Sequence, residues 1–192
     1  QTDQNLREMG TTVVLALVSG EELWIANVGD SRAYLVRGDA IQQLSVDHSQ
    51  VGSLVRAGCL TWDQAQKSTR RNILSRSLSA LGALAEPAIV REKWETGDGL
   101  VLCSDGLWGR VAERQIRGAV QRYAPERAVQ MLIALANRAG GDDNVSVVVV
   151  QNGIVPKKTN RWSAGLVRLA RNPWLVSLVA AVLLAALVLT IL

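Results

Sequence analysis

The interpretation of this sequence starts from one stretch, Val101-Leu102-Cys103-Ser104-Asp105-Gly106-Leu107-Trp108. Residues 100–103 form an apolar run too short for a helix, which predicts a buried strand. Ser-Asp-Gly follows and sets the carboxylate of Asp105 on a turn at the carboxyl end of that strand. Hard divalent cations take oxygen ligands, and a strand end holds such a ligand in a fixed direction. Asp-Gly is also ordinary turn chemistry, so this stretch alone leaves a metal ligand and a turn former equally open.

A second acidic element resembles the first. Gly140-Gly141-Asp142-Asp143-Asn144 precedes the run 145–150, which is apolar on both faces and therefore predicts a central strand. If the two strands are neighbours in one sheet, their carboxylates converge on a shared divalent cation. Ligation by oxygen alone favours magnesium, manganese or calcium over zinc. Paired hard metals typically activate a water for attack on phosphorus.

The remaining pattern predicts an α+β domain. Short strands joined by tight turns are expected at 11–19, 23–28, 31–37 and 41–44, and they indicate an antiparallel meander. A later strand at 89–94 is expected to pair with 100–103 across the turn Gly97-Asp98-Gly99. Helices are expected at 51–57, after the capping box at Thr61, at 113–123, and from Pro125 to about 139. These elements predict helices packed on antiparallel β-sheet.

The end of the chain has a different character. Residues 174–192 carry no charge, and a helix of that length spans about 28 Å, close to the hydrocarbon thickness of a bilayer. Five of the 21 basic residues lie after position 156, so the remaining 16 nearly balance the 17 acidic ones. The basic character therefore belongs to a juxtamembrane segment and does not indicate nucleic acid. We expect a folded domain at 1–152, a basic linker at 153–173 and a single-pass C-terminal transmembrane helix at 174–192, with the domain in the cytoplasm.

Five motifs occur along the chain in this order: Gly10-Thr11-Thr12, Asn27-Val28-Gly29-Asp30-Ser31-Arg32-Ala33-Tyr34, Leu44-Ser45-Val46-Asp47-His48-Ser49, Leu102-Cys103-Ser104-Asp105-Gly106-Leu107-Trp108 and Gly140-Gly141-Asp142-Asp143-Asn144-Val145-Ser146-Val147. Together they resemble the metal-dependent protein phosphatase 2C family in its bacterial serine/threonine phosphatase form. The resemblance runs from about Met9 to Gln151 and implies a central β-sandwich flanked by helices. It implies two or three manganese or magnesium ions and a metal-activated water that hydrolyses phosphoserine or phosphothreonine. Phosphoprotein substrates, and a cognate serine/threonine kinase as a partner, follow from it.

The same resemblance assigns the metal ligands. Asp105 and Asp143 match ligating aspartates, and Asp47 matches a position that helps bind a third, weaker metal. Asp30 and Arg32 match a motif that we interpret as structural, and the region 51–68 matches a flap near the site. His48 is interpreted as a hydrogen-bond partner, with a proton shuttle as the alternative.

The family's earlier motifs do not occur in this chain, which resembles the carboxyl-terminal part of the domain. The phosphate-binding arginine, the first acidic residue and the Asp-Gly that bridges both metals are expected upstream. An alternative function therefore stays open at this point. The protein could be a catalytically inactive, membrane-anchored phosphatase-like module that binds a phosphoprotein or kinase. Trp62, at the start of a surface helix, is the tryptophan we expect to contact a partner.

Overall fold

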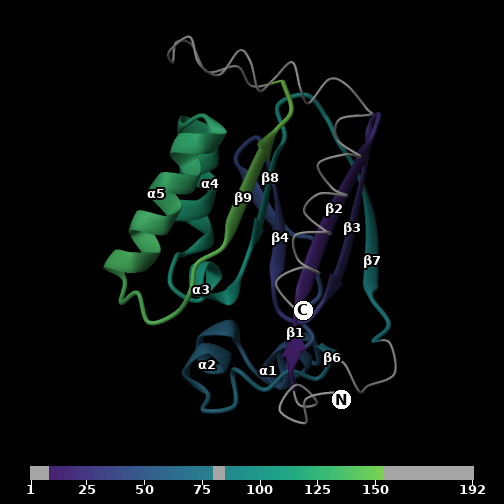
Figure 1. Ribbon diagram of the computed structural model, residues 1–192, viewed down its shortest axis with the longest axis vertical. Coiled ribbons are helices and arrows are strands. Elements are labelled where there is room, and N and C mark those ends of the chain that lie inside the picture. Colours follow the sequence, from purple (N-terminus) through teal and green to yellow (C-terminus); the bar gives the residue numbers. More distant parts are fainter. Residues whose placement is uncertain (1–8, 80–84, 154–192) are drawn as a thin grey trace, which may run out of the picture. The chain divides into compact units, whose positions relative to one another are not determined.

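A computed structural model describes residues 9–79 and 85–153 of the chain (Figure 1). In this part of the chain no helix is both long enough and apolar enough to cross a membrane. The predicted transmembrane helix at 174–192, and all of the predicted linker beyond residue 153, lie outside the described residues. The membrane anchor therefore stays a prediction.

Two antiparallel sheets form the centre of the described domain. The first has the order β2-β3-β7, with β2 at Val13–Ser19, β3 at Glu22–Val28 and β7 at Ala88–Lys93. The second has the order β5-β4-β8-β9, with β5 at Ala40–Gln43, β4 at Arg32–Arg37, β8 at Gly99–Cys103 and β9 at Val147–Gln151. Two short strands, β1 at Gly10–Thr11 and β6 at Leu78–Ser79, pair separately.

The alternation of side chains along β4 shows how the layers are built. Ala33 and Leu35 join a buried cluster with Leu23, Ile25 and Leu100, which fills the space between the two sheets. Tyr34 and Val36 point the other way, into a second cluster with residues of the helices. Because successive strand residues face opposite sides, one strand supplies both cores. The predicted β-sandwich is confirmed.

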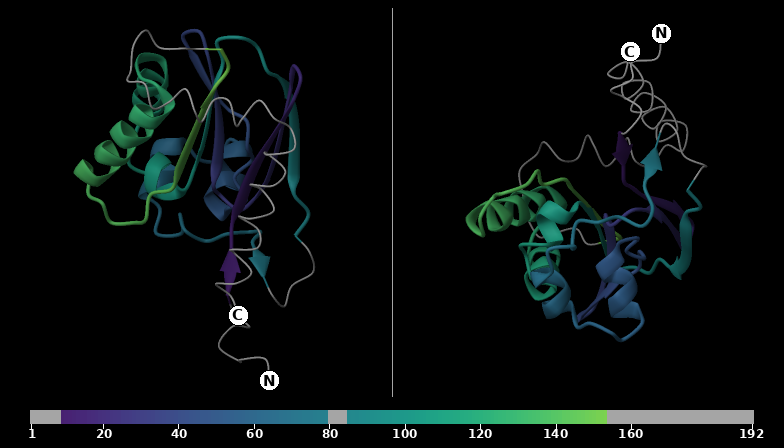
Figure 2. Two further views of the ribbon diagram at one scale, coloured as in Figure 1. Left: turned by 45° about the horizontal axis from the view of Figure 1, so that its top comes forward. Right: turned by 90° about the horizontal axis from the view of Figure 1, so that it is seen from below.

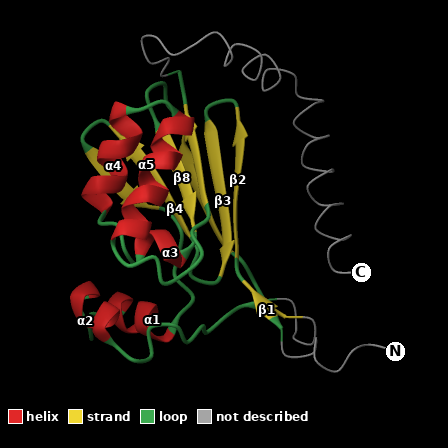
Figure 3. Ribbon diagram, turned by 60° about the vertical axis from the view of Figure 1, so that its left-hand side comes forward, coloured by secondary structure: helices red, strands yellow, loops and turns green. Residues whose placement is uncertain are grey.

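Helices cover the outer face of the four-stranded sheet (Figures 2 and 3). They are α4 at Glu113–Arg122 and α5 at Pro125–Arg138, which bury Ile116, Val120 and Leu132 against that face. Three shorter helices lie towards one end of the sandwich: α1 at Gln50–Arg56, α2 at Trp62–Lys67 and α3 at Asp105–Trp108 (Figure 3). The helix positions predicted from caps and from Pro125 are confirmed to within one or two residues at their starts.

The predicted strand pairing is wrong in two places. The meander is interrupted because β3 and β4 belong to different sheets, and the chain crosses between the sheets at Gly29. This glycine has φ +103°, and a Cβ there would collide with the side chain of Thr12. Strands β7 and β8 are not partners either, since β7 pairs with β3 and β8 with β4. A turn signal shows that the chain reverses, but it does not show whether the next strand joins the same sheet.

The prediction that the last strand is central is also wrong within the described residues. Strand β9 lies at the edge of its sheet, paired with β8 alone. Val149 packs against the helices, while Val148 and Val150, on the other face, are 54% and 41% exposed. Apolar residues on both faces of a strand do not show whether the strand lies at the edge or in the centre of its sheet.

Candidate metal centre

The ends of β8 and β9 bring the two predicted acidic elements together. The strands pair antiparallel with Cys103 opposite Val147, so the turn after β8 and the loop before β9 lie at the same end of the ladder. Ser104 joins the two segments. Its backbone N–H donates to the carbonyl oxygen of Ser146 at 3.1 Å, and its Oγ accepts from the Ser146 N–H at 3.0 Å. The condition that the sequence left open, that these strands are neighbours, is met.

Gly106 allows the acidic loops to approach closely. A Cβ at this position would lie 3.0 Å from the carbonyl carbon of Asn144 and closer still to its oxygen. Residues 142–144 therefore pack directly on the first turn of α3, which begins at Asp105. The Gly106 N–H donates to Oδ1 of Asp105 at 3.0 Å, and the Asn144 N–H donates to Oδ1 of Asp143 at 2.7 Å. Backbone amides thus orient one oxygen of each carboxylate.

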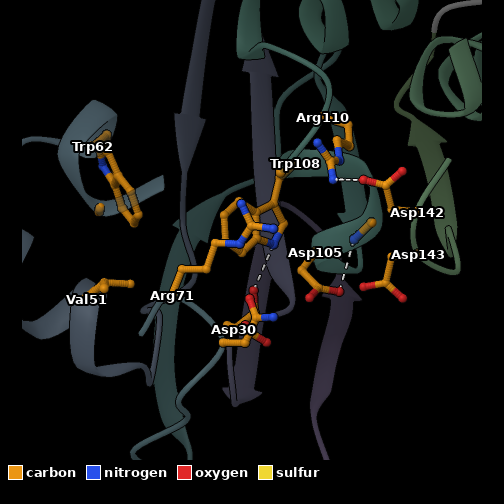
Figure 4. Close-up of a pocket in the computed structure, with 13 residues that line it drawn as sticks. Asp30, Val51, Trp62, Arg71, Asp105, Trp108, Arg110, Asp142 and Asp143 are labelled. Atoms are coloured by element: carbon orange, nitrogen blue, oxygen red, sulfur yellow. Dashed lines mark hydrogen bonds and ion pairs between the residues drawn. The ribbon is translucent and has the colours of Figure 1, made fainter. Parts of the chain in front are cut away.

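These carboxylates line a pocket of about 210 Å³ (Figure 4). One wall holds the acidic loops, and α1, α2 and the segment after them form the other. The pocket is lined by Asp30, Val51, Trp62, Ala65, Arg71, Asn72, Asp105, Gly106, Trp108, Gly109, Arg110, Asp142 and Asp143. The predicted position of the region 51–68 beside the site is confirmed.

Electrostatics make the acidic wall suitable for a cation. Burial raises the pKa of Asp105 above its usual value, and the negative charge of Asp143 raises it further. A divalent cation beside Asp105 would offset the charge that Asp143 places there, and oxygen donors are the ligands that magnesium and manganese prefer. Asp142 forms an ion pair with Arg110, which leaves Asp143 as the carboxylate that acts on Asp105. The donor set therefore fits the metals that the sequence predicted.

Asp30 is a site residue that the sequence reasoning missed. We interpreted its motif as structural, but the carboxylate lines the same pocket as Asp105. Burial, followed by the charge of Asp105, raises the pKa of Asp30 to about 6. The signal was present in the sequence, because Asp30 sits on a Gly-Asp turn directly after a strand, the arrangement that singled out Asp105. Asp30 thus adds a third carboxylate to the lining of this pocket.

The structure does not bring Asp47 to Asp105 and Asp143. The Asp47 side chain is 2% exposed, and its two oxygens accept hydrogen bonds from Arg32 at 2.7–3.2 Å. Gln43 donates a further bond to Asp47 at 2.8 Å, and Asp47 is absent from the pocket lining. Its assignment to a third metal stays a prediction, and the interaction present here is a buried ion pair.

His48 is also held outside the pocket lining. Its Nδ1 accepts a hydrogen bond from the Gly29 N–H at 3.2 Å, and burial lowers its pKa. A neutral, buried imidazole that accepts from the backbone agrees with the hydrogen-bonding role rather than with a proton shuttle.

Among residues 9–79 and 85–153, no group of three acidic, histidine or cysteine side chains is close enough to hold a metal ion by itself. Asp30, Asp105 and Asp143 line one pocket without forming such a group.

Comparison with known proteins agrees with this geometry. Residues 1–52 match the family model for protein phosphatase 2C. The serine/threonine phosphatase stp of Listeria innocua is 38% identical over 159 residues, which cover 82% of this chain and 62% of the relative. The chain thus spans about three fifths of the length of that relative.

Solved structures give the same result. The serine/threonine phosphatase MsPP of Mycobacterium smegmatis, in complex with cacodylate, aligns with a TM-score of 0.70 and 35% identity, over 78% of this chain and 67% of that one. The catalytic domain of the phosphatase PstP, in complex with two manganese ions, aligns with a TM-score of 0.68 and 36% identity, over 76% of this chain and 60% of that one. The fold is shared with these serine/threonine phosphatases. This chain belongs to the protein phosphatase 2C family, among its bacterial members.

Proposed function

We propose that the complete protein hydrolyses phosphoserine and phosphothreonine on proteins, with two or three manganese or magnesium ions as cofactors. The convergence of Asp105 and Asp143 in one pocket carries this proposal, and the names and manganese ions of the relatives support it. When bound, such ions supply Lewis acidity and an activated water. Asp105 and Asp143 would hold the metal, and Asp30 lines the same pocket.

The protein's own residues also prepare the pocket for a phosphate. The guanidinium groups of Arg71 and Arg110 line the pocket with the carboxylates, and they reduce the repulsion that a phosphate dianion would meet there. The amides of Gly106 and Asn144 keep the carboxylates oriented before substrate arrives. Preorganised ligands of this kind act without rearranging during the reaction.

The test is the variant Asp105→Asn in the full-length protein, measured as manganese-dependent phosphate release from a phosphoserine peptide. Removal of a ligating carboxylate is expected to lower kcat/KM by about 100-fold or more, because loss of a residue that merely supports a metal ligand already costs about 10- to 100-fold. Asp39→Asn is the matched control, since Asp39 is an exposed turn aspartate outside this pocket. Full activity of Asp105→Asn would overturn the metal assignment. A wild-type protein that binds the phosphopeptide without hydrolysing it would support the inactive binding module instead.

We also propose that residues 174–192 anchor the protein to the membrane with the phosphatase domain in the cytoplasm, where phosphoproteins and a cognate kinase would be its partners. The support is the uncharged 19-residue stretch and the basic residues before it. Native membranes washed with 1 M salt, a concentration that screens surface charge (about a 3 Å Debye length), should retain the protein, and detergent should release it. Release by salt alone would refute the anchor.

A further inference from the structure

We propose that Trp62 is a specificity-determining residue of this pocket, and that it selects phosphoserine and phosphothreonine peptides with an apolar side chain next to the phosphorylated residue. The inference rests on the proposed phosphatase function and names the substrate class that the pocket prefers. It starts from the observation that the two walls of the pocket differ in chemistry (Figure 4).

The first wall carries the carboxylates, and the second presents apolar side chains beside Arg71 and Asn72. Asp105, Asp142 and Asp143 lie on one side, and Val51 and Trp62 on the other, as Figure 4 shows. Val51 is itself buried, so the indole of Trp62, which is 38% exposed, supplies most of the apolar surface that a ligand could reach on this wall.

The indole is fixed in place from two directions. Thr61 caps the start of α2, with its N–H donating to Oε1 of Gln64 at 2.8 Å and its Oγ1 accepting from the Gln64 N–H at 3.3 Å. The Arg32 guanidinium lies over the Trp62 ring at 4.4 Å from the centroid, and over the Trp108 ring at 3.7 Å. The two indoles also contact each other edge to face, with centroids 6.5 Å apart.

Arg32 cannot easily leave this position. It is 5% exposed and bonded to Asp47, and its Nη1 donates to the Tyr34 hydroxyl at 2.8 Å. A cation between two aromatic faces is an attractive arrangement, most of all where water is excluded. Trp62 is therefore held rigidly, and binding of a substrate against it costs little conformational entropy of the indole side chain.

The position of the phosphate determines which part of a bound phosphopeptide contacts the Trp62 indole. A phosphorylated side chain directed to the carboxylate wall leaves the neighbouring peptide residues to face the opposite wall, where Trp62 and Val51 lie (Figure 4). An apolar side chain buries surface against the indole, whereas a glycine leaves the indole in water. The wall thus favours apolar flanking residues.

Exposure alone does not distinguish Trp62, because Trp24 provides a close comparison. Trp24 is 36% exposed and also has a guanidinium over its ring, that of Arg91 at 5.2 Å. Trp24 lies on β3, in the three-stranded sheet, and does not line the pocket. Trp24→Ala is consequently a matched control for the loss of an exposed, arginine-stacked indole.

The experiment compares two phosphoserine peptides, one with leucine and one with glycine on both sides of the phosphoserine. The full-length protein with Mn²⁺ is assayed for kcat/KM on each, and the readout is the ratio between the two values. Trp62→Ala is expected to lower the leucine-to-glycine ratio roughly tenfold, which is the scale of one apolar contact in a specificity pocket. Trp62→Phe is expected to keep most of the ratio, and Trp24→Ala is expected to keep all of it.

The ratio separates specificity from structure. If Trp62 only held α2 in place, Trp62→Ala would slow both peptides equally, and an unchanged ratio would overturn the proposal while leaving the phosphatase function intact. Absence of hydrolysis by the wild-type protein would count against the proposed function alone. In that case the affinity of the protein for the same two peptides, labelled and measured by fluorescence anisotropy, tests the role of Trp62. If wild type and Trp62→Ala bind each peptide with equal affinity, that role is refuted.

Discussion

Substitution of Gly106 by alanine tests whether close packing of the two acidic loops builds the metal centre. An added Cβ would lie 3.0 Å from the carbonyl carbon of Asn144 and closer still to its oxygen. Non-bonded heavy atoms prefer about 3.5–4.0 Å. Because the obstructing atoms are backbone, the clash can be relieved only if α3 and residues 142–144 separate by on the order of 1 Å.

Two losses follow from that separation. Overpacking of this kind costs about 1–3 kcal/mol of unfolding free energy. The displaced loop carries Asp143 away from Asp105, and metal ligands that are held about 1 Å too loosely lose affinity. We expect Mn²⁺ to bind about 10- to 100-fold more weakly, the range seen when the support of a ligand is removed.

The matched control is Gly118→Ala in α4. A Cβ there would meet nothing within 4 Å, and alanine in a helix interior is favoured over glycine by about 0.5–1 kcal/mol. Guanidinium unfolding in chelator, followed by tryptophan fluorescence, should therefore shift in opposite directions for the two variants. Manganese affinity, measured by titration calorimetry, should change only for Gly106→Ala. A Gly106→Ala protein with wild-type stability and wild-type affinity would refute the reasoning.

Three further predictions concern groups near this centre. Asp47→Ala leaves the Arg32 guanidinium buried without its carboxylate, and urea unfolding should show a loss of about 3–5 kcal/mol; unchanged stability with weakened manganese binding would instead favour the third-metal role. Burial lowers the pKa of His48 below its usual value of 6.5. The neutral imidazole therefore contributes fully to the stability of the folded protein above pH 6.5, and this contribution is lost as the pH falls through the pKa that His48 has in the folded state. A proton NMR titration of this single histidine checks the shift, and a pKa above 6.5 would contradict it. Cys59 is exposed and Cys103 is buried with its pKa raised to about 12, so a disulfide reagent should modify one thiol in the native protein and the second only on unfolding; two equally fast thiols would be the contrary result.

Local signals in the sequence predicted much of the fold. The capping box at Thr61 and the proline at position 125 mark helix starts that the structure confirms. Both features act through neighbouring backbone groups, so a few residues of sequence are sufficient to recognise them. The hairpins β2–β3 and β4–β5 were predicted for the same reason, since a tight turn joins each pair.

Pairing between distant strands was beyond those signals. The turns at Gly29 and Gly97 resemble in sequence the turns that close hairpins. Both, however, lead the chain from the three-stranded sheet into the four-stranded sheet. Strands in either sheet would bury one face in the same inter-sheet core, so their apolar patterns do not distinguish the two arrangements. Only the packed structure selects one.

The candidate metal site likewise has features that the sequence predicted and features that only the tertiary structure shows. The sequence by itself determined that Asp105 and Asp143 stand on turns next to strands, because turn signals are local, and the family resemblance implied that both bind a metal. The tertiary structure decided which other aspartate reaches the pocket. Asp30 and Asp47 both occupy loops after a strand, but Asp30 faces Asp105 while Arg32 holds Asp47 in a buried ion pair. Which of the two carboxylates lines the pocket depends on how the sheets and loops pack together, because the sequence of a loop does not determine its neighbours in space.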